Sequence, residues 1–115
     1  MTIRLVKKPI TKDELARLAS EGFGDMIKAA VDVEQEIMAV GGELHADEEA
    51  VLLEQGSRSS DVWGINVYPK KSEEEWIEFN SMINLKPALG NRSRGVDDVA
   101  RQQRIKSIVR KLIVD

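Results

Sequence analysis

The residues most able to do chemistry in this sequence gather between Trp76 and Gly95, WIEFNSMINLKPALGNRSRG. Apolar residues alternate with others in the first half, as in a strand, and Asn80 and Asn84 fall on the face opposite the apolar one. Asparagine is depleted in strands, and its amide can both donate and accept hydrogen bonds. Asn80 and Asn84 are therefore candidate ligand-binding residues.

Two arginines, Arg92 and Arg94, follow in a loop between glycines. Their guanidinium groups, together with exposed backbone amides, would suit an anion, although no lysine follows at the spacing of a P-loop. The structural alternative is a clasp, in which these arginines pair with Asp32, Glu36 or Glu78 and fix the loop to the rest of the chain.

The one histidine adds a catalytic hypothesis. If the segment after Gly42 is extended, His45 can share an open sheet face with Asn66, Glu78, Asn80 and the two arginines. A carboxylate base, a histidine acid and two arginines would suffice for metal-independent RNA cleavage, with His45 and Glu78 as the catalytic candidates. In the structural alternative, His45 is a partly buried or capping imidazole, and Asn66, Asn80 and Asn84 bond to the backbone at sheet edges.

Composition removes several classes of site. With no cysteine and one histidine, the chain cannot build a disulfide, a thiolate metal site or a multi-histidine metal site, and we predict neither a metal nor a cofactor. Its 115 residues predict a single domain over residues 1–115. No apolar run is long enough for a signal peptide or a membrane span, so we expect a soluble cytoplasmic protein without membrane contact.

Charge is distributed unevenly along the chain, whose net charge is −3. Residues 1–90 hold 10 Lys and Arg against 17 Asp and Glu, whereas residues 91–115 hold 7 against 3. The basic end could bind phosphates or an acidic partner, or it could pack against the chain's own acidic segments. The acidic total argues against broad nucleic-acid binding and leaves only a local patch for it.

The elements expected to position these residues begin with a short edge strand before Pro9. Thr11 and Glu14 form a capping box, which predicts a helix over residues 12–20. Apolar residues at spacings of four, three, four and three predict a second helix over residues 26–40, ended by two glycines.

From Glu43 to Gln55 the pattern favours a strand, with a short helix capped by Asp47 over the second part as the alternative. Strands are predicted over residues 62–68 and 75–86, and a final helix begins after Asp97 or Asp98. The predicted fold is α+β, an antiparallel meander of three or four strands with two N-terminal helices and one C-terminal helix.

Three segments resemble a family of small prokaryotic proteins classed as a domain of unknown function: FGDMIKAAVDVEQEI (23–37), GGELHADEEAVLLEQGSRSSDVWGINVYP (41–69) and the segment 76–95. The resemblance implies a prokaryotic origin and brings no known activity. The expected order of elements is also similar to that of toxin nucleases of the RelE and ParE type, a likeness of topology alone.

The function predicted from the sequence is that of a non-enzymatic binding or interaction module. It would be a homodimer whose polar sheet face and arginine loop bind a small anionic ligand or a protein partner. The alternatives are a small metal-independent hydrolase or ribonuclease-like enzyme, and a partner in a toxin–antitoxin pair.

Overall fold

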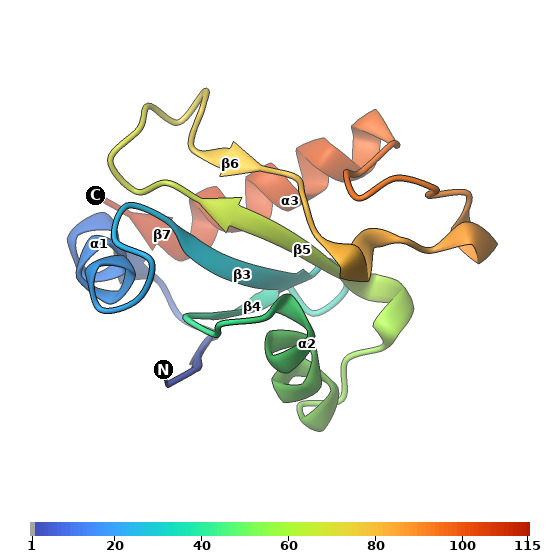
Figure 1. Cartoon of the computed structure of the whole chain (residues 1–115), viewed down its shortest axis with the longest axis horizontal. Helices are drawn as coiled ribbons and strands as arrows, with labels where there is room; N and C mark the ends of the chain where they lie inside the picture. The colour runs from blue at the N-terminus through green and yellow to red at the C-terminus, as the bar shows by residue number, and fades with distance from the viewer. Residues whose placement is uncertain (1) are drawn as a thin grey trace.

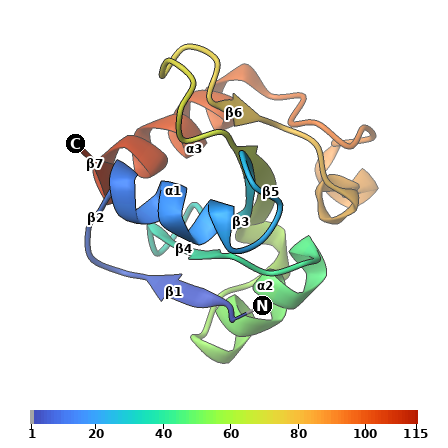
Figure 2. The same ribbon diagram turned by 60° about the vertical axis from the view of Figure 1, so that its left-hand side comes forward.

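The centre of the protein is a five-stranded antiparallel sheet, in a computed structural model that describes residues 2–115. The strands lie in the order β1 (Arg4–Val6), β4 (Ile37–Val40), β3 (Ile27–Asp32), β5 (Val62–Val67) and β6 (Ile77–Glu78). Figures 1 and 2 show α1 (Lys12–Ser20) and α3 (Val99–Leu112) on one face of this sheet and α2 (His45–Glu54) on the other. A parallel pair, β2 (Ile10–Thr11) and β7 (Ile113–Val114), joins the start of α1 to the end of α3.

The α+β class and the two helices with clear capping signals are confirmed. The Thr11 hydroxyl accepts a hydrogen bond from the Glu14 backbone N–H at 3.0 Å and begins α1. Asp98, one of the two predicted caps, begins α3 by accepting from the Ala100 backbone N–H at 2.9 Å. The edge strand near the N-terminus is β1, and the strand predicted over residues 62–68 is β5.

The helix predicted over residues 26–40 is wrong, because this segment is the hairpin of β3 and β4. β3 lies in the middle of the sheet with helices over both faces, so apolar residues follow one another along it, and a helical spacing can be found among them. Asp32 builds the turn: its Oδ1 accepts from the backbone N–H groups of Glu34 at 2.8 Å and Gln35 at 3.1 Å. Only one helix, α1, therefore precedes this hairpin.

Two other strand predictions are corrected. Residues 45–54 form α2, close to the helical alternative, and no extended strand occupies this segment. The strand predicted over residues 75–86 is reduced to β6, after which the chain turns through the 3₁₀ helix η2 (Met82–Asn84). The sheet thus has five strands instead of three or four, and the order of elements that resembled the toxin nucleases does not hold.

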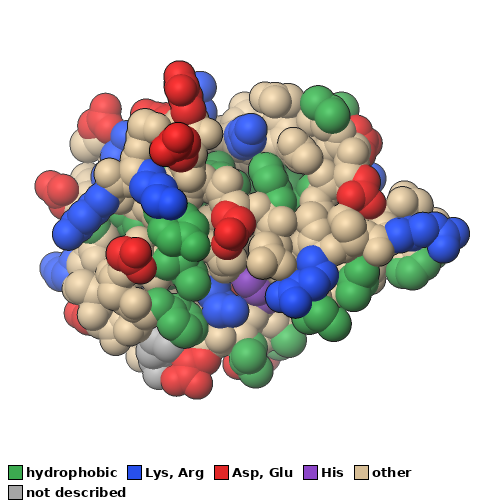
Figure 3. Space-filling model, turned by 45° about the horizontal axis from the view of Figure 1, so that its top comes forward, with side chains coloured by type: hydrophobic (Ala, Val, Ile, Leu, Met, Phe, Trp, Pro, Cys, Tyr) green, Lys and Arg blue, Asp and Glu red, His purple; other side chains and the backbone are tan. Residues whose placement is uncertain are grey.

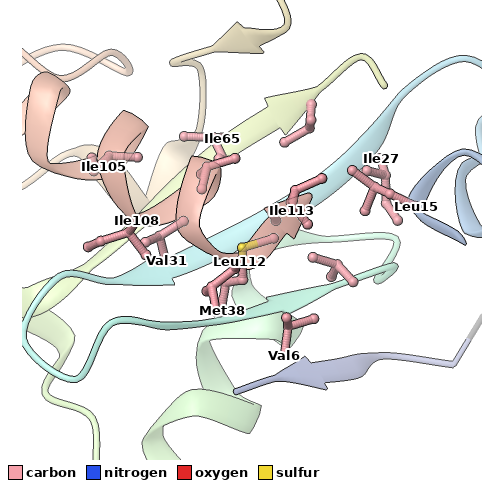
Figure 4. Close-up of a cluster of buried hydrophobic side chains, with 14 of the residues drawn as sticks. Val6, Leu15, Ile27, Val31, Met38, Ile65, Ile105, Ile108, Leu112 and Ile113 are labelled. Carbon is pink, nitrogen blue, oxygen red and sulfur yellow. The ribbon is translucent and has the colours of Figure 1, made fainter. Parts of the chain in front are cut away.

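The main core lies between the sheet and the helices α1 and α3, and Figure 4 shows part of it. Its labelled members come from both helices, from four strands of the sheet and from β7: Val6, Leu15, Ile27, Val31, Met38, Ile65, Ile105, Ile108, Leu112 and Ile113. A smaller apolar cluster, in which Leu52 of α2 packs on Ala30 and Val62, covers part of the opposite face. In residues 2–115 no helix has the length and apolar character needed to cross a membrane.

Candidate functional site

The part of the α2 face left uncovered by apolar residues carries a line of polar side chains. Lys28 on β3 is paired in register with Asn66 on β5, and Asn66 is paired in turn with Glu78 on β6. These three residues, the polar row, therefore lie side by side across three neighbouring strands. The Asn66 Nδ2 donates to Glu78 Oε1 at 2.8 Å, which turns the amide oxygen away from Glu78. That oxygen is buried and has no hydrogen-bond partner within residues 2–115.

His45, the first residue of α2, packs onto β5 next to the polar row. Its Nε2 lies 2.8 Å from the Ile65 carbonyl oxygen, and because a carbonyl only accepts, Nε2 carries the hydrogen. The ring can lie this close to the sheet because residue 64 is glycine. A Cβ at Gly64 would stand 3.1 Å from His45 Cδ2 and 2.5 Å from the Ser81 side chain. In the neutral ring, Nδ1 is left as an acceptor.

Burial is the main cause that lowers the pKa of His45. The Ile65 carbonyl and the Asn66 side chain raise this pKa, while the positive charges of Lys28 and Arg94 lower it further. His45 is therefore neutral at pH 7, with two cations close enough to influence its proton. Figure 3 shows the histidine (purple) between basic side chains, with an acidic side chain nearby.

Glu48 faces the sheet one turn after His45 and is fully buried. Its Oε2 accepts from the Gly42 backbone N–H at 2.9 Å, whereas its Oε1 has no hydrogen-bond partner within the described chain. Burial raises the pKa of Glu48 to about 8, so the carboxyl group is mostly protonated and neutral at pH 7. Glu48 therefore does little to neutralise the nearby Lys28 at that pH.

Asn84 bonds to the backbone, as the structural alternative for it expects. Its buried side chain accepts from the Gly64 backbone N–H at 2.8 Å and donates to the Gly64 carbonyl at 3.0 Å. It takes the place of a neighbouring strand beside β5, at the point where β6 has ended. The same amide donates to the Arg94 carbonyl at 2.9 Å, and so does the Ser81 backbone N–H. This network holds the backbone of Arg94 next to the sheet.

A second buried asparagine, Asn91, shapes the rest of the arginine loop. Its Nδ2 donates to the carbonyls of Asn84 at 2.7 Å and Gly95 at 2.9 Å, and its Oδ1 accepts from the Asp97 backbone N–H at 2.8 Å. The loop is therefore fixed by asparagine amides.

The predicted clasp, in which Arg92 and Arg94 pair with Asp32, Glu36 or Glu78, is not found: neither arginine forms an ion pair within residues 2–115. Glu36 instead pairs with two residues of α3, Arg104 at 3.4 Å and Lys111 at 3.2 Å.

Four of the predicted site residues come together on the α2 face: His45, Asn66, Glu78 and Arg94. Asn80 is exposed, and within residues 2–115 its side chain makes no hydrogen bond. Arg92 is also exposed, and its backbone N–H donates to Asp97. Asn80 and Arg92 therefore have no observed connection to the polar row.

Sequence reasoning missed Lys28, although a signal for it exists. Lys28 is the only charged residue in the otherwise apolar run over residues 26–31. The run was interpreted as a helix, which hid that Lys28 belongs to a sheet. Tyr68 was also missed. Burial, followed by the charge of Glu78, raises the pKa of its hydroxyl, and the effect of Glu78 shows that Tyr68 lies near the row.

The polar row is an open surface, and a large hollow lies elsewhere. That hollow, of about 720 Å³, runs between α3 and the loop before β6. Two charged residues of its walls, Arg110 and Glu73, pair with each other at 3.3 Å. We regard the polar row with the nearby Arg94 as the stronger candidate, because Lys28 and Arg94 form no ion pair within residues 2–115. Within residues 2–115, no three or more His, Cys, Asp or Glu side chains group as a metal site would require.

Family membership agrees with the resemblance seen in the sequence. The profile of a family described as a protein of unknown function, DUF5674, matches residues 4–112. The chain belongs to the DUF5674 family. The match to DUF5674 includes the polar row, α2 and the arginine loop, and the family carries no known activity. No curated protein and no solved structure matches the chain.

Proposed function

We propose that this DUF5674 protein binds a small anionic ligand on the polar row, where Lys28 and Arg94 supply the positive charge. The observation that carries the proposal is that neither cation has an ion-pair partner within residues 2–115. Both cations also disfavour protonation of the buried His45. A bound anion would neutralise this local excess of positive charge.

The start of α2 supports the same proposal. Leu44 occupies the N-cap position and its side chain does not cap the helix, whose Asp47 backbone N–H donates to the Leu44 carbonyl at 3.1 Å. The N-terminal end of a helix carries partial positive charge, which attracts anions. Because α2 begins at His45, this end lies beside Lys28 and Asn66.

Binding is a better fit than the predicted hydrolase or ribonuclease activity. His45 Nε2 is held by the Ile65 carbonyl, and Glu78 accepts a hydrogen bond from Asn66. Each of the two catalytic candidates thus already has a structural contact, whereas Lys28 and Arg94 have none with a carboxylate.

The test is titration calorimetry with inorganic phosphate at constant ionic strength. We expect saturable binding that Lys28→Gln and Arg94→Gln each weaken by about tenfold, the effect of losing one charged hydrogen bond. Arg92→Gln is the matched control, since it removes the same charge from the same exposed loop. It should leave the affinity within about twofold, because a distant exposed charge is screened by salt. An equal loss in Arg92→Gln, or no saturable binding at all, would refute the proposal.

A further inference from the structure

We infer that the ligand bound on the polar row carries a hydrogen-bond donor next to its negatively charged group, as a protonated phosphate or an ammonium carboxylate does. The inference rests on the proposed function and narrows the ligand class of the same site. It follows from the acceptors that surround the two cations. A site for a bare oxyanion such as sulfate is expected to present donors only, and the polar row does not.

Glu78 is the acceptor that a ligand can reach, because its side chain is exposed. Asn66 Nδ2 bonds to Oε1 of this carboxylate at 2.8 Å and holds it toward the row. A carboxylate offers about four lone-pair positions, so the contacts of Glu78 with Asn66 and the nearby Tyr68 hydroxyl leave others available. A fully deprotonated oxyanion would be repelled by Glu78, whereas an anion with an O–H or N–H group would donate to it.

Two further acceptors point to the same ligand class. The Asn66 amide oxygen has no hydrogen-bond partner within residues 2–115, and the neutral His45 ring keeps a lone pair on Nδ1. The amide oxygen is enclosed, so it acts on a ligand through its partial negative charge and not by direct contact. Both groups make the surroundings of the cations less favourable for a bare oxyanion.

The spacing of the row suits one small ligand. Neighbouring strands lie about 4.8 Å apart, so the backbones at Lys28 and Glu78, two strands apart, are separated by about 10 Å. The long side chains of these two residues can bridge that distance and contact a ligand of a few atoms from both sides. Lys28 would then bind the negative oxygens of the ligand, and Glu78 would accept a hydrogen bond from its donor group.

The experiment compares inorganic phosphate, sulfate and glycine by calorimetry at constant ionic strength. At about pH 7.5 phosphate is largely a tetrahedral dianion like sulfate, but it keeps one O–H group. Glycine supplies the ammonium carboxylate. We expect phosphate or glycine to bind about tenfold or more tightly than sulfate, the effect of one charge-assisted hydrogen bond. Which of the two binds more tightly identifies the source of the donor.

Glu78→Gln tests whether Glu78 causes this preference. Because Glu78 is exposed, the variant should fold, and it should bring the ratio of affinities to within about threefold, mainly by strengthening sulfate binding. Glu75→Gln, in the exposed loop before β6, is the matched control and should keep the wild-type ratio. Equal binding of sulfate by the wild-type protein, or an unchanged ratio in Glu78→Gln, overturns the inference and leaves the anion site standing. If none of the three compounds binds, the proposed function itself fails.

Discussion

The two faces of the central sheet differ in where their charged side chains lie and in whether these side chains form ion pairs. On the face covered by α1 and α3, charged side chains lie outside the core and several form ion pairs, as Glu36 does with Arg104 and Lys111. On the α2 face, Lys28 stands within the sheet itself and has no ion-pair partner in the described chain. The first face is arranged for stability. The second carries groups that cost stability, which is typical of functional sites.

Hydrogen bonding shows the same contrast. Three buried side-chain polar atoms within residues 2–115 have no partner, and two of them, Glu48 Oε1 and Asn66 Oδ1, are on the α2 face. The third is the indole nitrogen of Trp63, in the main core. A buried polar atom without a hydrogen bond costs about 1–3 kcal/mol. The α2 face therefore holds two destabilising polar atoms, one on the first turn of α2 and one on β5.

The largest expected effect on stability comes from the α3 side. Ile108→Ala should lower the free energy of unfolding by about 2–5 kcal/mol, because it leaves a cavity in the main core. Its phosphate affinity, measured under conditions where the variant is folded, should match that of the wild type. Urea unfolding and calorimetry measure the two quantities. A large loss of affinity in the folded variant would mean that the two faces are not separable.

Asn84→Ala should affect both stability and binding, because Asn84 connects β5 to the arginine loop. Losing its side chain leaves the Gly64 backbone N–H and carbonyl without partners and should cost about 2–4 kcal/mol. Phosphate affinity should also fall, since the Arg94 carbonyl loses a hydrogen bond. Unchanged affinity in the folded variant would show that Arg94 does not need this support.

Glu48→Gln should stabilise the protein, and the gain should grow with pH. The pKa of Glu48 is about 8 when folded, above its ordinary 4.5, so between these values the unfolded state releases a proton that the folded state keeps. Stability is therefore lost as pH rises through this window. Glutamine does not titrate, and we expect a gain of about 1–3 kcal/mol at pH 8, reduced by the cost of burying an amide.

Urea unfolding of both proteins at several pH values measures this difference. Glu49→Gln, the neighbouring and less buried position on α2, is the control and should show no such trend. His45 acts in the opposite direction, since its lowered pKa removes stability as pH falls below its ordinary value of 6.5. A Glu48→Gln gain that does not change with pH would show that Glu48 is ionised in the folded protein.

The smallest effect is expected for Glu36→Gln, which breaks two exposed ion pairs at α3. The Lys111 ammonium lowers the pKa of Glu36, so these pairs stabilise the protein above the ordinary carboxylate pKa and lose their effect as pH falls. The variant should show a slight fall in Tm at low salt that disappears at high salt. Thermal unfolding at two salt concentrations measures it, and a salt-independent fall would indicate a packing role for Glu36.

Capping and hydrophobic periodicity predicted the elements that carry these signals strongly. Thr11 with Glu14, and Asp98, mark the starts of α1 and α3, and β5 has its turn residues before it. The hairpin of β3 and β4 was missed because both faces of β3 are buried, which removes the alternation of a surface strand.

The strand was preferred to the helical alternative at α2 for a different reason: two of the three buried residues of α2, His45 and Glu48, are polar, so no apolar stripe marks the helix. Polar residues at inward positions are where the local pattern and the tertiary structure disagree. The same disagreement hid Lys28 and left open whether Asn84 bonds to a ligand or to the backbone. The homodimer and the prokaryotic origin inferred from the sequence stay predictions.

The most direct test of the anion site is an NMR titration of the labelled protein with inorganic phosphate, following backbone amide shifts. We predict saturable shifts at Gly64, Asn66 and the first turn of α2, with little change along α3. These shifts should vanish in Arg94→Gln and persist in Arg92→Gln. Shifts concentrated on α3, or no saturable shift in any amide, would contradict the assignment of the α2 face as the binding face.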